Sequence, residues 1–363
     1  MENTNKNKVE KGQDLIETSL MASGLIVGII FGFVLQRGRF CMNSAFRDII
    51  LMKEYTLLKA VALAIVVQMI GFHLLATLGY IELYPKTFYW GAMIFGGFIF
   101  GIGMVLAAGC ASGTTYRVGE GMMGSFVALL GLMIGGLITS GGALKDLKSY
   151  LQPSEGALKA ITTDNPGPYL GNANLTLANV FGLDPWIFVV IIAIIILAVL
   201  IWKRGGSEET KTEGTAYEKI FKRGWNWWVT GIAIGIIGII AFIAYKKYAL
   251  GISGGWFGFL EALITPDHDK LNWFTFLVIG VVIGAAVAAV IAGEFKLRAP
   301  NARRLLQQFI GGLIMGIGAV IGTACNIGHI LSGVPQLALS SILGGIFIVL
   351  GCWVAAYIMF MRG

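Results

Sequence analysis

Charged side chains are scarce in this chain. Only 13% of its 363 residues are charged, whereas 56% are hydrophobic, and the mean hydropathy is +0.77. A soluble domain carries about 25% charged residues, which excludes a water-soluble globule of this length. The net charge of +7 is typical of basic cytoplasmic loops in a membrane protein. Because no basic stripe carries interleaved aromatic residues, we expect no nucleic-acid partner.

Metal ligands and paired thiols are also scarce. The chain has three histidines and four cysteines, and Cys325 with His329 makes only an incomplete zinc site. We therefore expect no metal and no cofactor. The cysteines stand in apolar segments that the sequence assigns to different sides of the membrane, so no disulfide framework is expected. A membrane thiol oxidoreductase would require a nearby cysteine pair such as Cys-x-x-Cys, which the sequence lacks. We therefore expect that the chain is not an enzyme.

Long apolar runs, in contrast, are abundant. A membrane span takes about 20 apolar residues, and the runs predict an all-α integral membrane protein with about nine transmembrane helices in contact with membrane lipid. The expected spans are 20–36, 57–80, 90–109, 122–142, 185–202, 227–248, 272–293, 306–323 and 338–360. Four further segments, 41–53, 111–120, 252–264 and 325–336, are too short to cross. They suggest re-entrant half-helices, since irregular backbone at membrane depth is tolerated where it lines a cavity.

The positions of lysine and arginine predict the orientation. If the linker 203–224 is cytoplasmic, most of the 27 basic residues fall on its side, as the positive-inside rule requires. The N-terminus is then outside and the C-terminus cytoplasmic. We expect a polar N-terminal tail at 1–19 without the features of a signal peptide, a first membrane repeat at 20–202 with an outer loop near 143–184, and a second membrane repeat at 225–363.

An internal repeat links the two halves. Five residues of the first half keep a constant offset from five of the second: Gly96, Gly97, Gly101, Gly103 and Cys110 against Gly311, Gly312, Gly316, Gly318 and Cys325. Helix packing through small residues explains the glycines but not a cysteine at the same offset. Because an odd number of spans lies between the two cysteines, the repeats would be inverted. Inverted repeats with binding near the midplane are a known transporter plan.

Three of the four cysteines, Cys41, Cys110 and Cys325, stand where a span gives way to a short polar segment. Such a break aims backbone N–H groups at a cavity, and the start of a half-helix offers unsatisfied donors and a positive dipole end to an anion. Cys352 lies inside the last apolar run and is interpreted as a small packing residue. The three cysteines at breaks are therefore the candidate functional residues.

The segment Phe31–Asp48, which contains Gln-Arg-Gly-Arg-Phe-Cys-Met-Asn-Ser, resembles the N-terminal signature of the YeeE/YedE family. Gly101–Gly113 and Gly312–Gly328 resemble the second and third cysteine segments of that family. Ser253–Trp256 and Gly293–Arg298 also resemble family patterns. The resemblance is specific because these segments agree in order and spacing over most of the chain.

The resemblance implies uptake of thiosulfate across the bacterial inner membrane for sulfur assimilation. The three signature cysteines of the family match Cys41, Cys110 and Cys325, which would then line the route, and short half-helices would narrow the fold centrally like an hourglass. A small sulfur-carrier protein of the TusA type would be a separate partner on the cytoplasmic side. A transporter of another small sulfur or selenium compound stays an alternative. The polar breaks argue against a purely structural subunit.

Thiosulfate is a small dianion with a soft terminal sulfur, to which protonated thiols donate weak hydrogen bonds. Polar side chains beside the cysteines are expected to replace water around its oxygens. They are Asn43, Ser112, Thr114, Thr115 and Asn326. Three arginines are expected either to attract the anion at the inner mouth or to act as positive-inside anchors: Arg37, Arg39 and Arg117. Glu294 is expected to pair with its neighbours Lys296 or Arg298.

Overall fold

The computed structural model describes residues 2–155, 158–163, 170–172, 174–202, 215, 217–246, 248–265 and 271–362, with side chains from residue 19 onward. Nine segments of these residues are long and apolar enough to span a membrane. Their long helices are α1 (Glu2–Arg37), α3 (Thr56–Thr77), α4 (Trp90–Leu106), α6 (Met123–Ser140), α9 (Pro185–Trp202), α10 (Trp227–Tyr245), α12 (Trp273–Ile291), α13 (Ala302–Ile321) and α14 (Leu339–Phe360). The all-α class and the number of spans are confirmed.

Short helices follow the predicted breaks. They are α2 (Met42–Met52), α5 (Ala111–Gly119), α11 (Ser253–Ile264) and the π-helix η4 (Ile327–Gly333) with the 3₁₀ turn η5 (Val334–Gln336). The connections hold α7 (Lys145–Leu151), α8 (Leu177–Phe181) and η2 (Glu218–Lys222). The path of the short helices relative to a bilayer stays a prediction, as do the boundaries of the two repeats. Most of the predicted linker lies outside the described residues.

Helix contacts recur in a paired order. α1 packs against α12 as α10 packs against α3, and α4 packs against α14 as α13 packs against α6. In this comparison α1 corresponds to α10, α12 to α3, α4 to α13 and α14 to α6. The contact between α1 and α12 thus corresponds to that between α10 and α3, and the contact between α4 and α14 corresponds to that between α13 and α6. This pairing is the one that the predicted repeat requires, and the inverted orientation itself stays a prediction.

Glycines let these helices approach closely. A Cβ atom added at Gly101 would overlap the carbonyl oxygen of Ile348, where α4 meets α14. One added at Gly312 would overlap the carbonyl oxygen of Ala128, where α13 meets α6. Even alanine would therefore push the helices apart. Close helix packing, the alternative explanation given for the repeated glycines, therefore accounts for Gly101 and Gly312.

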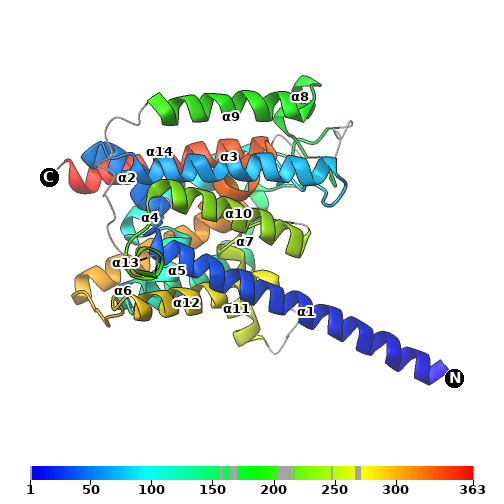
Figure 1. Cartoon of the computed structure of the whole chain (residues 1–363), viewed down its shortest axis with the longest axis horizontal. Helices are drawn as coiled ribbons and strands as arrows, with labels where there is room; N and C mark the ends of the chain where they lie inside the picture. The colour runs from blue at the N-terminus through cyan, green and yellow to red at the C-terminus, as the bar shows by residue number, and fades with distance from the viewer. Residues whose placement is uncertain are drawn as a thin grey trace.

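The connections define two opposite faces of the bundle. The long-loop face carries the loop 78–89 and the described parts of 143–184, which are joined by backbone bridges such as Leu83–Leu170. Figure 1 shows the N-terminus at this end, and the first turns of α1 project beyond the bundle in all views. The segment predicted as a polar tail thus continues the first span as one helix from Glu2.

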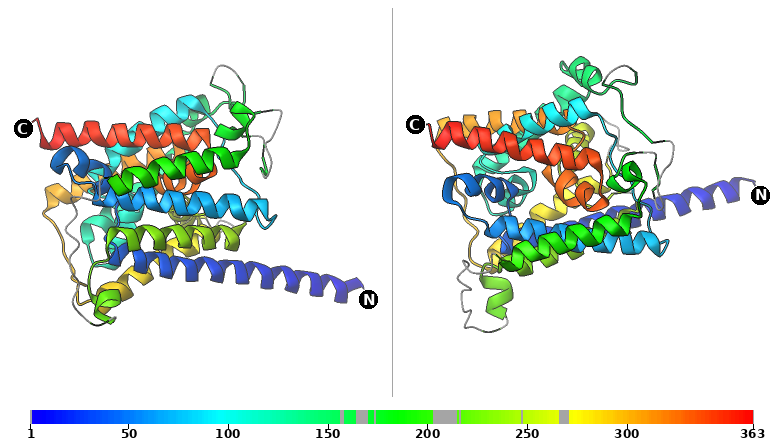
Figure 2. Two further views of the ribbon diagram at one scale, coloured as in Figure 1. Left: turned by 45° about the horizontal axis from the view of Figure 1, so that its top comes forward. Right: turned by 90° about the horizontal axis from the view of Figure 1, so that it is seen from above.

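The linker face lies at the other end, beside the C-terminus (Figures 1 and 2). It carries the ends of α1, α5 and α12 together with η2. A backbone bridge joins Met122 to Arg298 there, and the backbone N–H of Trp225 donates to the carbonyl oxygen of Arg37. The start of the second half is therefore tied directly to the end of the first helix.

Candidate functional site

A left-handed backbone conformation precedes each of the three candidate cysteines. Arg39 (φ 46°), Ala108 (φ 57°) and Thr323 (φ 64°) each lie two residues before a cysteine. Residues other than glycine rarely adopt this conformation, and where they do the surroundings must hold them. Each residue lies at the end of a long helix and reverses the chain direction in the manner of a helix C-cap. The three breaks therefore share one local geometry.

Side chains from the helices that follow hold two of these breaks in place. The Nη1 group of Arg117 donates to the carbonyl oxygen of Ala108 at 2.7 Å. The Nε2 atom of His329 lies 2.7 Å from the carbonyl oxygen of Gly322, and its Nδ1 atom lies 3.2 Å from the hydroxyl of Ser341. Both carbonyl groups lie just beyond the last helical residue of a span. Arg117 and His329 thus satisfy acceptors that the broken helices leave without an internal partner.

The first two cysteines meet at the centre of the fold. The Sγ atoms of Cys41 and Cys110 lie 3.7 Å apart, and both residues are buried. Cys41 precedes α2 and Cys110 precedes α5, whose Gly113 N–H donates to the sulfur of Cys110 at 3.3 Å. In the predicted topology both cysteines follow spans that end on the cytoplasmic side, and their contact is compatible with that prediction.

Cys325 lines a cavity of about 380 Å³ on the long-loop face. The walls are the loop 78–89, the residues before α11, the end of α13 and η4. Because Cys325 is at the same time almost fully buried, it lies at the inner end of this space. The other two candidate cysteines do not line it.

A lysine that the sequence analysis did not single out shares this cavity. Lys86 lies over the ring of Tyr248, 5.2 Å from its centroid, and its Nζ group donates to the carbonyl oxygen of Thr323 at 3.5 Å. Burial lowers the pKa of Lys86. The sequence did contain a signal for Lys86. It is a basic residue in a short loop on the predicted outer side, where the positive-inside rule disfavours basic residues.

Two polar atoms of the cavity wall lack a hydrogen-bond partner within the described part of the chain. They are the hydroxyl oxygen of Thr323 and the amide oxygen of Gln336. Buried polar atoms without partners carry a free-energy cost of about 1–3 kcal/mol. A ligand or water in the cavity would relieve that cost. The Thr323 hydroxyl can donate to an anion held beside Lys86.

A second cavity, of about 420 Å³, opens on the linker face. Its walls carry the basic residues Arg39, Arg117, Lys296 and Arg298 and the acidic residues Glu120 and Glu294. Basic side chains outnumber acidic ones, which favours an anion. Of the three arginines predicted at the inner mouth, Arg39 and Arg117 line this cavity, whereas Arg37 is buried.

Glu294 pairs with residues far from it in the sequence. One carboxylate oxygen accepts from Arg37 at 2.6 Å and the other accepts from Arg39 at 3.1 Å. The expectation that Glu294 pairs with Lys296 or Arg298 is therefore wrong. The chain turns sharply after α12, at Gly293 with φ 70°, which points the carboxylate toward the end of α1.

Gln36 links the two carboxylates of the linker face. Its Nε2 group donates to Glu294 at 2.8 Å and to Glu120 at 3.1 Å. Burial raises the pKa of Glu294, but the hydrogen bond from Gln36 and the charges of Arg37 and Arg39 outweigh burial and hold the pKa below its usual value. For Glu120 burial prevails and the pKa is raised. Glu294 is thus the stable negative partner of the buried arginine.

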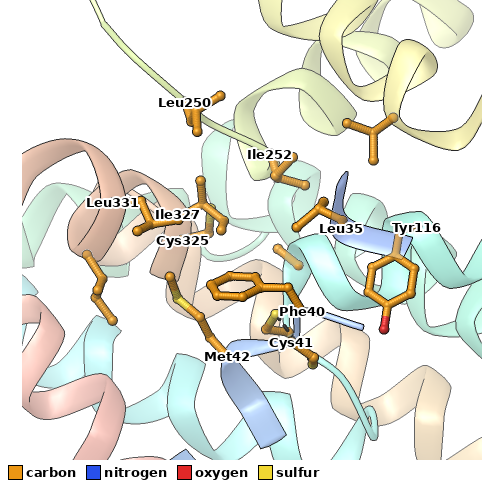
Figure 3. Packing of buried hydrophobic residues seen from close by; sticks show 14 of the residues in the cluster. Leu35, Phe40, Cys41, Met42, Tyr116, Leu250, Ile252, Cys325, Ile327 and Leu331 are labelled. Atoms are coloured by element: carbon orange, nitrogen blue, oxygen red, sulfur yellow. Dashed lines mark hydrogen bonds between the residues drawn. The ribbon is translucent and has the colours of Figure 1, made fainter. Parts of the chain in front are cut away.

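Apolar side chains separate the two cavities. Phe40, Met42 and Ile327 are fully buried, and Figure 3 shows the ring of Phe40 between Cys41 and Cys325. The two cavities share no lining residue. This conformation is therefore closed at its centre, and an ion could pass only if these side chains moved.

The two predicted asparagines lie beside the central sulfur atoms. Asn43 accepts a weak hydrogen bond from the thiol of Cys352 at 3.7 Å, and Asn326 donates to the sulfur of Met42 at 2.9 Å. Within the described residues, the Nδ2 group of Asn43 and the Oδ1 atom of Asn326 have no partner. Asn43 therefore retains a buried donor at the level of the Cys41–Cys110 pair.

The predicted hydroxyl residues of α5 are engaged within the protein. The hydroxyl of Ser112 lies 3.4 Å from the sulfur of Cys110. Thr114 and Thr115 each donate to the carbonyl oxygen of Ala111, and Thr115 also accepts from the indole of Trp256 at 2.9 Å. Ser112 is therefore the one of the three whose hydroxyl lies directly beside a candidate sulfur.

Residues 37–354 match the family described as sulphur transport. The chain belongs to this family. It is similar to the thiosulfate transporter TsuA of Spirochaeta thermophila, with 42% identity over 346 residues that cover 94% of this chain and 99% of the relative. It is 32% identical to the thiosulfate transporter TsuA of Escherichia coli over 354 residues, which cover 95% of this chain and 96% of the relative. A shorter match, 36% over 115 residues, covers 31% of this chain and 28% of the probable transporter YedE of Escherichia coli.

The YeeE/YedE resemblance is thereby confirmed, and the sulphur transport region includes the candidate cysteines and the residues that line both cavities. It spans the three cysteine-bearing breaks, the lysine of the long-loop cavity and the carboxylates of the linker face. No group of three or more His, Cys, Asp or Glu side chains that could hold a metal ion occurs in the described residues. The candidate site of this sulphur transport protein is therefore a set of thiols, amides and basic groups.

Proposed function

We propose that this chain takes up thiosulfate across the bacterial inner membrane. The single observation that carries the proposal is that Cys325 and Lys86 share one cavity. Thiosulfate combines a double negative charge with a soft sulfur atom, and this cavity offers a cation and a thiol together. Sulfate would satisfy the cation equally but has no soft atom for the thiol. The names of the two full-length relatives support the same substrate.

The proposed route begins in the long-loop cavity. Lys86 attracts the dianion, the hydroxyl of Thr323 binds an oxygen, and the thiol of Cys325 donates to the terminal sulfur. The ion then passes Phe40 to the level of Cys41 and Cys110, where Asn43 offers a free amide donor. Several weak sites in series allow release as well as entry, since tight binding at any one would stop conduction.

The proposed exit is the linker-face cavity. Glu294 makes two ion pairs, one with the buried Arg37 and one with Arg39, whose side chain is 70% exposed. An arriving anion can therefore compete with Glu294 for Arg39. The ion pair between Arg37 and Glu294 stays in place. A sulfur-carrier protein of the TusA type would receive thiosulfate at this face. Arg37 then acts as an anchor, while Arg39 and Arg117 contact the ion.

The decisive experiment measures the accumulation of labelled thiosulfate in cells that lack other importers of sulfur oxyanions. Cells that produce the chain are expected to accumulate the label, and cells with an empty vector are not. Absence of uptake in cells whose membranes contain the protein would overturn the proposal. Unlabelled sulfate, other sulfur oxyanions and selenite are each added in excess. Stronger competition by one of them than by unlabelled thiosulfate would identify an alternative substrate.

A further inference from the structure

The sulfur atoms of Cys41 and Cys110 form the closest approach of two thiols in the described part of the chain. They lie 3.7 Å apart, whereas Cys325 and Cys352 have no sulfur partner among the described contacts, and all four thiols are free. Weak hydrogen bonding to a substrate does not require two thiols in mutual contact. This arrangement therefore suggests a second property of the pair.

We propose that Cys41 and Cys110 are a reversible oxidation site, at which a disulfide forms and stops transport. The inference that transport stops rests on the proposed function, whereas the oxidation site does not. A disulfide bond is about 2.05 Å long, so each sulfur must move by less than an ångström. Rotation of the two side chains can supply such a movement.

The local structure leaves room for that movement. Gly113 faces the pair, and a Cβ atom added there would lie 2.6 Å from the sulfur of Cys41 and 3.3 Å from that of Cys110. Glycine at this position therefore keeps the space that both sulfurs share. A methyl group would occupy it and force the sulfur of Cys41 to move.

Two helix starts converge on the pair. Cys41 directly precedes α2 and Cys110 directly precedes α5. The start of a helix stabilises negative charge, and the thiolate is the form that reacts in disulfide chemistry. The N–H group of Gly113 already donates to one of the two sulfurs. These donors therefore favour a thiolate at one of the two sulfurs.

The oxidant that we propose is a peroxide, which is close to water in size and uncharged. One thiolate attacks the peroxide oxygen to give a sulfenic acid and releases the first water after protonation. The second thiolate attacks that sulfur, the disulfide forms, and the second water leaves. Two thiols thus lose two electrons and two protons, and one hydrogen peroxide becomes two waters. A dithiol reductant returns the pair to the reduced state.

The link would act at the closed centre of the proposed route, between the two cavities. It joins the break after α1, which carries Phe40 and Arg39, to the start of α5. Phe40 could then no longer move away from the centre, and both S–H donors would be lost. Oxidation is therefore expected to arrest the protein in its closed conformation.

The first part of the test needs no transport. The purified full chain in detergent is treated with hydrogen peroxide and digested, and its peptides are identified by mass spectrometry. The expected product is a Cys41–Cys110 linked peptide with the loss of two hydrogen atoms, together with two remaining free thiols out of four. Cys352→Ala should form the same link, while Cys110→Ala and Gly113→Ala should not or should do so far less. Four unchanged thiols, or separate sulfinic acids at the two positions, would overturn the oxidation site.

The second part measures thiosulfate uptake into proteoliposomes before oxidation, after it, and after addition of dithiothreitol. Uptake is expected to fall more than about tenfold, since the covalent link removes both donors, and to return on reduction in both the parental protein and Cys352→Ala. Uptake that persists while the link is present would overturn the switch. Formation of the link in a protein that never transports thiosulfate would support the oxidation site and refute only the proposed substrate.

Discussion

At the scale of single residues, four cysteines of the same chemistry have three different surroundings. Cys325 lines a cavity with a cation, Cys41 and Cys110 lie against each other, and Cys352 packs inside α14 with its thiol toward an asparagine. A thiol acts as a small hydrophobic group or as a reactive one according to such surroundings. Each substitution is therefore expected to have its own effect.

Serine at Cys110 or at Cys325 is expected to abolish most thiosulfate uptake. A hydroxyl is smaller and harder than a thiol, and neighbouring carbonyl groups hold it more strongly, so it matches the terminal sulfur poorly. The measurement is initial uptake of labelled thiosulfate, normalised to the amount of protein in the membrane. Parental rates in both Cys110→Ser and Cys325→Ser would mean that these thiols only pack the fold.

Alanine at Cys352 is expected to leave uptake near the parental rate. Its thiol makes one weak contact, to Asn43 at 3.7 Å, and lines neither cavity. The same uptake assay applies, with membrane abundance checked by immunoblot. A strong loss of transport at normal abundance would show that the Cys352–Asn43 contact belongs to the route.

Lys86 is expected to make uptake sensitive to alkaline pH. Burial lowers its pKa, so as the pH rises its positive charge is lost earlier than that of an ordinary lysine, and attraction of the dianion weakens. Lys86→Gln should raise the concentration for half-maximal uptake by about tenfold, the equivalent of roughly 1.4 kcal/mol. Lys86→Arg should keep activity to higher pH, because arginine stays charged. Identical pH profiles for the parental protein and Lys86→Arg would contradict this role.

At the scale of helices and their ends, ion pairs across the linker face hold the breaks together. Arg37 at the end of α1 is 1% exposed and binds both Glu294 after α12 and the carbonyl oxygen of Phe221 in η2. Three segments that are distant in the sequence thus depend on one guanidinium group. A buried charge without its partner is costly, so this contact is a sensitive point of the fold.

Glu294→Gln is expected to destabilise the protein by about 3 kcal/mol, because it leaves Arg37 buried without a counter-ion. The pKa of Glu294 is lowered in the folded protein, so its stabilising effect is present above the pKa of the unfolded chain. The effect is lost as the pH falls through the lower, folded pKa. Thermal unfolding in detergent at several pH values measures both effects. Glu155→Gln, which changes an exposed carboxyl group on the long loop, is the control and should unfold like the parental protein.

At the scale of the whole molecule, the two faces differ in charge and in the lengths of their connections. The linker face has a cavity lined by four basic residues, and the long-loop face has the lysine-containing cavity beside Cys325. Uptake requires that the long-loop face is outside. The predicted orientation agrees with this requirement.

Labelling of introduced cysteines tests that orientation. Ser154→Cys on the long loop should react with an impermeant maleimide in intact cells, whereas Arg303→Cys, at the start of α13, should react only after permeabilisation. Both positions are exposed, and the four native cysteines are buried. The reverse pattern would invert the topology and turn the proposed entrance into the exit.

Local sequence patterns predicted most of the elements. Apolar run length placed α3, α4 and α14 within a few residues, because the thickness of a bilayer sets how many apolar residues a span must have. The short segments after the cysteines were also found, since they are polar and too short to cross. The starts of α1 and α13 were missed, because polar residues there extend each helix ahead of its apolar part.

The sequence by itself determined the membrane class, the number of spans and the three cysteine-bearing breaks, because all of these depend on residues close together in the chain. Only the tertiary structure decided which groups meet. The Cys41–Cys110 contact joins positions 69 residues apart and the Arg37–Glu294 pair joins positions 257 apart, while Lys86 reaches Cys325 from the opposite half of the chain. Such contacts depend on how helices pack around their glycines, and helical spacing along one segment carries no information about the partner that it will face.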